Sequence, residues 1–311
     1  HLVRLVEQAS ASHRFALLES IKQFSLERLL SPEEERAQRD RHAAWVADLI
    51  EALEPGVMSP EWDANQRRFR AHLDDLYAAL SWAIERAAPV TAAPIFAAAR
   101  LYWSTSIPWE TSYDWLQRVM AVLDPAAPGP PLAARFMTAA GLVAYHAGQL
   151  AESDRFFEQA IELARRAANV PVLALAICRH GQTLRGLGES DRADAMMREL
   201  RDLAPRITDQ AVRFAVYNEL GAQVLFHQDL DAAWADLHEA LASARALGYP
   251  AAEGVVLHFL GYVAALRGEL DVARDAFHHA CTLQAVGVET QRLSTIHGLG
   301  RVEYLARRPV E

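Results

Sequence analysis

The residues best suited to chemistry are the histidines. The chain has 12 of them, and the adjacent pair His278 and His279 lies between His258 and His297 in the sequence. Imidazole nitrogens are common zinc ligands. Adjacent residues on a helix, however, point about 100 degrees apart, so they do not share a face as an i, i+4 pair does. We therefore expect ordinary helix residues here and no metal site.

Motifs for catalysis are absent from the sequence. A phosphate-binding loop of the Gly-x-x-x-x-Gly-Lys-Ser/Thr type needs a lysine directly after glycine, and the single lysine, Lys22, follows Ile21. HExxH, GxSxG and CxxC motifs are also missing. Cys178 and Cys281 lie about a hundred residues apart and are expected to be small core residues. The sequence predicts no enzyme activity and no cofactor.

Two further clusters have a structural explanation. Glutamates occupy positions 33 to 35, at an expected helix start, where carboxylates interact favourably with the helix dipole. Trp103, Trp109 and Trp115 lie in one short stretch. We expect them to form a packed cap at the start of a helical stack, and a ligand cage is the alternative.

Length, charge and hydropathy narrow the class of protein. The chain of 311 residues is 51% hydrophobic and only 8% aromatic, which favours helices around two cores or one extended core. The net charge of −9 repels phosphate polyanions, so we expect no direct binding of nucleic acid. The apolar run 87–103 is interrupted by Pro89, Pro94 and Arg100, which predicts no membrane span. The cysteine usage favours the cytoplasm.

The strongest pattern is a repeat. Four glycines lie 40 residues apart, and a fifth follows 39 residues later: Gly141, Gly181, Gly221, Gly261 and Gly300. Seven residues beyond three of them stand Gly148, Gly188 and Gly268, which suit the left-handed turn that ends a helix. Each period is therefore expected to be a hairpin of two helices. The last one is cut short, and the chain begins at His1, so we expect a piece of a longer protein.

Small and large residues alternate in the second half of each period. Large residues lie 16 positions after the glycine, and small or apolar residues lie 12 and 19 positions after it: Phe157, Met197, Leu237 and Phe277, with Ser153, Ala193, Ala233 and Ala273, and Ala160, Leu200, Ala240 and Ala280. Small residues let two antiparallel helices approach closely. The large ones are expected to fill the space to the next hairpin.

This pattern resembles the tetratricopeptide repeat (TPR), in which Leu-Gly is followed by a bulky residue and then by Ala, an aromatic residue and Ala. The ordinary repeat has about 34 residues, so the helices or turns are expected to be longer here. The resemblance implies an all-α fold, a right-handed superhelical solenoid of antiparallel helix pairs. Its units are predicted near 91–130, 131–170, 171–210, 211–250 and 251–289, with a partial unit at 290–311. Arg100 takes the glycine position of the first unit.

The N-terminal part resembles another family. Residues 14–29, 41–45 and 61–83 look like the segments between the winged helix and the repeats of bacterial STAND-ATPase transcriptional regulators of the MalT-like and LuxR-type class. This resemblance implies the end of a winged-helix-like segment and a linker helix at 1–30, a helical linker region at 31–90 and repeats at 91–311. It also implies a sensor region in a larger regulator, in contact with that protein's other domains.

The spacing of apolar residues supports part of this division. Phe15, Leu18 and Ile21 predict one amphipathic helix over residues 14 to 30. A second helix is expected over 33 to 54, capped by Ser31 and Pro32. Residues 2 to 6 are either the last strand of a truncated winged helix or a disordered start.

The first helices of stacked hairpins line a concave groove. Positions −6, −3, +1, +4 and +5 from the glycines place polar and aromatic residues in this groove: Arg135, Thr138, Tyr145, His146, Gln182, Arg185, Asn218, Phe226, His258, Tyr262, His297, Arg301 and Tyr304. Such a surface suits a protein or a small-molecule effector. It contains no lysine, so the lysine-rich carboxylate clamp of chaperone-binding TPR proteins is not reproduced. The alternative is a scaffold for self-association or for bridging proteins, in which these residues only solvate the groove.

Overall fold

We describe a computed structural model of the chain. It describes residues 3–9, 12–17, 21, 24, 31–54, 59–123, 129–223, 227, 229–283 and 289–306. Strands β1 (Val3–Ala9) and β2 (Ser12–Leu17) form an antiparallel pair ahead of the helices. The strand alternative for residues 2 to 6 therefore holds over Val3–Ala9. The helix expected from residue 14 is wrong at its start, because residues 12–17 pair with β1 and a short apolar run does not distinguish strand from helix.

Three linker helices follow: α2 (Pro32–Leu53), α3 (Trp62–Ala71) and α4 (Leu73–Glu85). The start of α2 is as predicted. The Ser31 hydroxyl accepts a hydrogen bond from the Glu34 amide at 3.2 Å, and the Glu34 carboxylate accepts one from the Ser31 amide at 2.8 Å, which satisfies two otherwise unpaired donors. The buried residues Val46 and Ile50 of α2 belong to the core that continues into the repeats.

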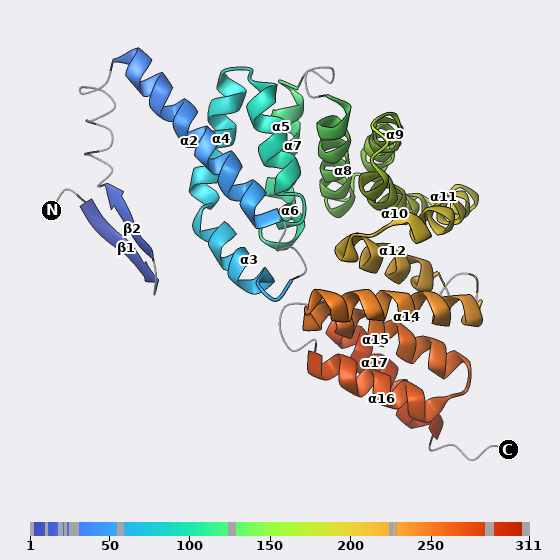
Figure 1. Cartoon of the computed structure of the whole chain (residues 1–311). Coiled ribbons are helices and arrows are strands. Elements are labelled where there is room, and N and C mark those ends of the chain that lie inside the picture. The colour runs from blue at the N-terminus through green and yellow to red at the C-terminus, as the bar shows by residue number, and fades with distance from the viewer. Residues whose placement is uncertain are drawn as a thin grey trace.

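The remaining helices stack as hairpins along a bent rod (Figure 1). They are α5 (Pro89–Ala98), the short α6 (Tyr102–Thr105) and α7 (Trp109–Met120), then the pairs α8 (Pro130–His146) and α9 (Leu150–Arg166), α10 (Val170–Gly186) and α11 (Ser190–Leu203), α12 (Gln210–Ala222) and α14 (Leu230–Leu247), α15 (Pro250–Leu266) and α16 (Leu270–Leu283), and finally α17 (Glu289–Ala306). The prediction of an all-α, TPR-like solenoid of antiparallel helix pairs behind linker helices is confirmed, with the β1–β2 hairpin as an addition to it.

The repeated glycines mark close contacts inside each hairpin. A Cβ atom added to Gly141 would lie 2.8 Å from the Phe157 ring, and one added to Gly221 would lie 2.4 Å from Leu237. The large residue therefore packs against the glycine of its own hairpin, a contact in addition to the expected one with the next hairpin. Phe277 does both, because a Cβ on Gly298 of α17 would lie 2.7 Å from its ring. The turn glycines behave as predicted, with positive φ at Gly148, Gly188 and Gly268.

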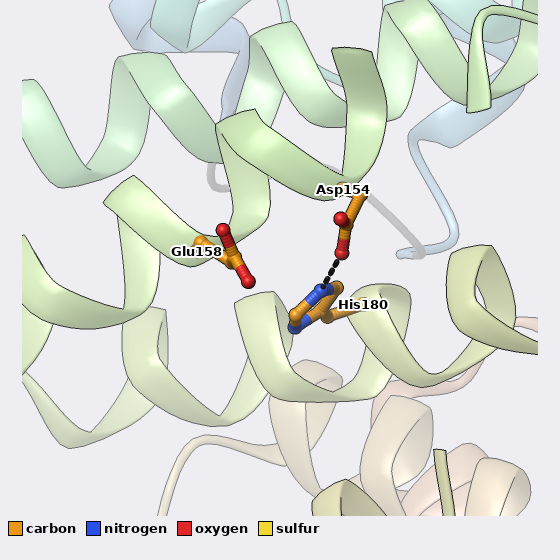
Figure 2. A group of neighbouring side chains, drawn as sticks. All are labelled: Asp154, Glu158 and His180. Carbon is orange, nitrogen blue, oxygen red and sulfur yellow. Dashed lines mark hydrogen bonds and ion pairs between the residues drawn. The ribbon is translucent and has the colours of Figure 1, made fainter. Parts of the chain in front are cut away.

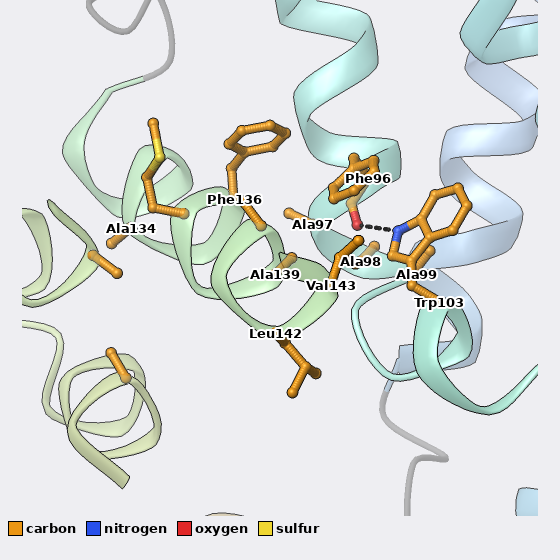
Figure 3. Packing of buried hydrophobic residues seen from close by; sticks show 14 of the residues in the cluster. Phe96, Ala97, Ala98, Ala99, Trp103, Ala134, Phe136, Ala139, Leu142 and Val143 are labelled. Atoms are coloured by element: carbon orange, nitrogen blue, oxygen red, sulfur yellow. Dashed lines mark hydrogen bonds between the residues drawn. The ribbon is translucent and has the colours of Figure 1, made fainter. Parts of the chain in front are cut away.

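The first repeat packs around aromatic side chains. Figure 3 shows Phe96 of α5 beside Trp103 of α6 and Phe136 of α8, and the Trp103 indole donates a hydrogen bond to the Phe96 carbonyl oxygen at 3.0 Å. Trp103 and Trp115 are buried, as the packed cap requires. Trp109 departs from it, since 48% of this residue is exposed.

No helix in the described part of the chain combines the length and hydropathy of a membrane-spanning segment.

Candidate functional site: the concave groove

The groove follows from how the hairpins stack. The first helices of successive units contact one another, α5 with α8, α8 with α10 and α10 with α12, more closely than the second helices do. The rod therefore bends toward the first helices, and α9 and α11 lie on the outer side of the bend in Figure 1.

Cys178 lies on α10, one of the first helices, but is buried. Burial raises the pKa of its thiol to about 12, so it stays a protonated core residue.

An arginine cluster lies in the first half of the groove. We use this name for Arg100, Arg135 and Arg179 together with Glu54. Arg135 of α8 donates a hydrogen bond to the Glu54 carboxylate, at the end of α2, at 2.5 Å. Arg100 lies in the turn between α5 and α6 and is partly buried. A cavity of about 60 Å³ opens between them, lined by Glu54, Ala97, Arg100, Arg135, Thr138, Val172 and Leu175.

The charges of the arginine cluster are not balanced. Burial and, after it, the nearby positive charge of Arg179 lower the pKa of Arg100 to about 10, against the attraction of Glu54. Burial also raises the pKa of Glu54, which the charges of Arg135 and Arg100 oppose. Within the described residues the Arg100 guanidinium makes no hydrogen bond or ion pair, and only the backbone amide of Arg100 is bonded, to the Ala97 carbonyl oxygen at 3.2 Å. Three cations therefore share one carboxylate in a partly desolvated place.

The middle of the groove is organised by Glu219 of α12. Its buried carboxylate accepts hydrogen bonds from Arg185 at 2.7 Å, from Gln182 at 2.5 Å and from Gln223 at 3.0 Å. Arg185 and Gln182, two of the predicted ligand residues, thus hold α10 against α12. The side-chain oxygen of Asn218 is buried and has no hydrogen-bond partner in the part of the chain that the structure describes.

Aromatic rings pack together where α7 begins and α8 ends. The exposed Trp109 packs on His146 at 5.1 Å between ring centroids, and Tyr145 meets His146 edge-on at 5.4 Å. Burial lowers the pKa of His146, and the charge of Arg179 adds to this effect. The charge of Arg179 thus acts on both His146 and Arg100. Thr138 lines the cavity but is buried, and its hydroxyl donates to the Ala134 carbonyl oxygen at 2.8 Å.

The predicted residues of the C-terminal units do not join this surface. His258 is buried and shares a hydrogen bond of 2.8 Å with the Thr295 hydroxyl, and Tyr262 donates to the Ser294 carbonyl oxygen at 3.5 Å. Both contacts join α15 to α17. His297, Arg301 and Tyr304 are exposed on α17, and Phe226 lies outside the described residues.

Sequence reasoning therefore missed part of the site. Arg100, Arg179, Trp109 and Glu54 were not among the predicted groove residues, although each lies at the surface just described. For Arg100, the sequence did contain a signal, because this arginine takes the position of the repeated glycine in the first unit. Arg179 lies at position −2, which the five chosen positions do not include. Glu54 belongs to a linker helix, and the repeat pattern says nothing about it.

The buried His258 makes stability depend on pH. Burial lowers the pKa of this imidazole from 6.5 to about 4. Above pH 6.5 the imidazole is neutral in both the folded and the unfolded chain. Between pH 6.5 and about pH 4 the unfolded chain binds a proton at this residue and the folded chain does not, so acid favours unfolding. We expect His258 to lower the unfolding free energy by about 2 kcal/mol between pH 7 and pH 5.

Urea unfolding at the two pH values checks this prediction. The decline should be smaller by that amount in a His258→Gln variant, while His238→Gln, at an exposed histidine, should keep the decline of the natural chain. Equal declines in all three proteins would contradict the assignment.

One group among the described residues has the composition of a cation site. Figure 2 shows Asp154 and Glu158 of α9 beside His180 of α10, with candidate ligand atoms within 4.8 Å of one another. His180 Nε2 lies 2.7 Å from Asp154 Oδ1. The Arg192 guanidinium bonds to Asp154 at 3.3 Å and to Glu158 at 2.8 Å. Because this cation already neutralises the carboxylates, we interpret the group as an ion-pair network between α9, α10 and α11.

Comparison with known proteins identifies the fold. No protein-family model matches the chain, and no curated protein does. Among solved structures, the STAND protein with a tetratricopeptide repeat sensor from Pyrococcus horikoshii matches with a TM-score of 0.59 and 14% identity, over 94% of this chain and 40% of that one. A Rap protein complexed with Competence and Sporulation Factor matches with a TM-score of 0.57 and 12% identity, over 87% and 88%. The chain is thus a TPR-like helical repeat protein in fold, and it spans 40% of the length of the STAND protein.

Proposed function

We propose that this chain is the non-catalytic sensor and interaction region of a larger bacterial transcription regulator of the STAND-ATPase, LuxR-type class, and that it binds a protein or small-molecule effector in its concave groove. The observation that carries the proposal is the arginine cluster, where Arg100 faces a cavity without a carboxylate of its own. The half-exposed Trp109 packs on His146, another predicted groove residue. Ligand-binding grooves commonly combine charged hydrogen-bond donors with flat apolar side chains.

The elements that precede the repeats support the proposal of a larger regulator. The β1–β2 hairpin ahead of α2 suits the end of a winged-helix-like segment. The ion pair between Glu54 and Arg135 ties the linker helices to the repeats. A ligand in the groove that prefers one arrangement of these parts shifts the whole protein toward that arrangement. Such a cytoplasmic sensor needs no chemistry of its own.

Thermal unfolding with a panel of polar metabolites and short peptides tests the proposal. A true groove ligand at 100 times its dissociation constant stabilises the folded chain by about 2.7 kcal/mol. The double variant Tyr145→Ala/His146→Ala should lose most of this gain, because it removes aromatic surface from the groove. Arg166→Ala, at an exposed position of α9, should keep it. A ligand that stabilises all three proteins equally would bind elsewhere, and the sensor proposal would then fail.

A scaffold for self-association is the second candidate, and α17 favours it. Leu293 and Tyr304 on this helix are 64% and 58% exposed, and Ile296 and Leu305 are exposed as well. An apolar face of this kind often marks a protein interface. Sizing chromatography across a range of concentrations separates the two candidates. Assembly that Leu293→Glu abolishes supports the scaffold, whereas a concentration-independent monomer that binds a groove ligand supports the sensor.

A further inference from the structure

We propose that Arg100, Arg135 and Arg179 form a receptor for a compact oxyanion, a carboxylate or phosphate group carried by the ligand of the groove. The inference deepens the proposed function, since it takes the groove as the binding surface. The oxyanion is one part of the ligand, and the rest of the ligand is expected to contact the aromatic rings of Trp109, Tyr145 and His146.

The three arginines come from three places in the fold. Arg100 lies in the turn after α5, Arg135 on α8 and Arg179 on α10. Arg100 and Arg135 line the same cavity, and the positive charges of Arg179 and Arg135 both act against the charge of Arg100. Like charges gathered by the fold repel one another, so their convergence costs stability in the absence of an anion.

The charge count of the cluster is unusual for this molecule. Other partly buried arginines have their own carboxylates: Arg185 pairs with Glu219 at 2.7 Å, and Arg213 pairs with Glu239 at 2.7 Å. In the cluster only Glu54 is negative, and it pairs with Arg135. Arg179 bonds to the neutral Gln182 at 3.0 Å, and its buried Nε has no hydrogen-bond partner among the described residues. Counted over these four residues alone, the excess is two positive charges in a chain whose net charge is −9. The exposed Glu51 is a further negative charge that acts on Glu54.

The shape and lining of the cavity suit an oxyanion. Its volume of about 60 Å³ is several times what one water needs, which leaves room for a carboxylate or phosphate group. Planar guanidinium groups donate paired hydrogen bonds to such groups. Ala97, Val172 and Leu175 supply apolar walls, and a low local dielectric strengthens each charge-assisted hydrogen bond. Glu54 occupies part of this place and competes with the ligand for Arg135.

Titration calorimetry with inorganic phosphate and, separately, with malonate tests the inference, with chloride holding the ionic strength constant. We expect at least one of the two anions to bind, and the one that binds more tightly identifies the source as a phosphate or a carboxylate. Arg100→Gln should weaken this binding about tenfold, the effect of losing one charge-assisted hydrogen bond. Arg166→Gln, which removes an equal charge from the outer helix α9, should leave it unchanged.

A second variant keeps the test independent of the folding of Arg100→Gln. Glu54→Gln removes the competing carboxylate, so the anion should bind several-fold more tightly and should raise the melting temperature more than in the natural chain. Binding of neither anion, or equal weakening by Arg100→Gln and Arg166→Gln, would overturn the inference.

The outcome is separable from that of the proposed function. If a neutral effector stabilises the chain through Tyr145 and His146 while phosphate and malonate fail to bind, the sensor proposal stands and the oxyanion receptor falls. If an anion binds through Arg100 while no panel compound stabilises the chain, the receptor stands and the sensor proposal falls.

Discussion

Replacement of Arg185 by alanine is expected to lower the free energy of unfolding by about 3–5 kcal/mol. The side chains of Arg185 and Glu219 are only 12% and 10% exposed, and their charged atoms lie 2.7 Å apart. Without Arg185, the Glu219 carboxylate keeps hydrogen bonds from two neutral amides but has no compensating charge. An uncompensated buried charge costs far more than the pair contributes in net stability.

Two controls make this prediction specific. The double variant Arg185→Leu/Glu219→Leu removes both charges, so it should recover most of the lost stability. Arg165→Ala breaks a more exposed pair, in which Arg165 lies 2.7 Å from Glu199, and should cost less than about 1 kcal/mol. Urea unfolding followed by circular dichroism measures all three. If Arg185→Ala costs no more than Arg165→Ala, Glu219 does not organise the middle of the groove.

Replacement of Gly261 by valine is expected to lower the free energy of unfolding by about 3 kcal/mol, the upper end of the cost of overpacking a core. A Cβ at this position would lie 2.8 Å from the Phe277 ring, and the valine methyl groups extend further. The ring has little room to move, because it is fully buried and also packs closely against Gly298.

Gly300 provides the matched control for this substitution. It occupies the same phase of the repeat in α17, yet no described atom lies within 4 Å of an added Cβ. Gly300→Val should therefore change the stability by less than about 0.5 kcal/mol, since valine is a slightly better helix former than glycine. Thermal or urea unfolding compares the two variants. If they are equally stable, the repeated glycine is not there for close packing.

The repeat was predictable because each period needs residues of particular sizes at fixed positions. Each period combines a glycine, a large residue that packs on it and a second glycine with positive φ at the turn, as Gly141, Phe157 and Gly148 show. These are local requirements, and they leave a direct trace in the sequence. The β1–β2 hairpin was harder to predict, because residues 12–17 form a strand through pairing with β1, and the spacing of apolar residues in one segment does not reveal its partner.

The groove was predictable only in part. Of the predicted groove residues, Arg135 and Thr138 line the cavity, while His146 packs against the exposed tryptophan and Tyr145 against His146; that they bind a ligand stays a prediction. Position within the repeat could not show that Gln182 and Arg185 are held by Glu219, or that Thr138 is bonded within its own helix, because those partners depend on how neighbouring hairpins stack. The charge excess was also hidden. Its arginines are at least 35 residues apart in sequence and meet only in the fold.

Hydrogen–deuterium exchange with and without a stabilising ligand from the panel tests the central claim most directly, because it maps where the ligand binds. The account predicts slower exchange at the end of α5 and along α8, α10 and α12, the helices that line the groove, with little change in α9, α11 and α14. Protection concentrated on those second helices, or on the exposed face of α17, would contradict it.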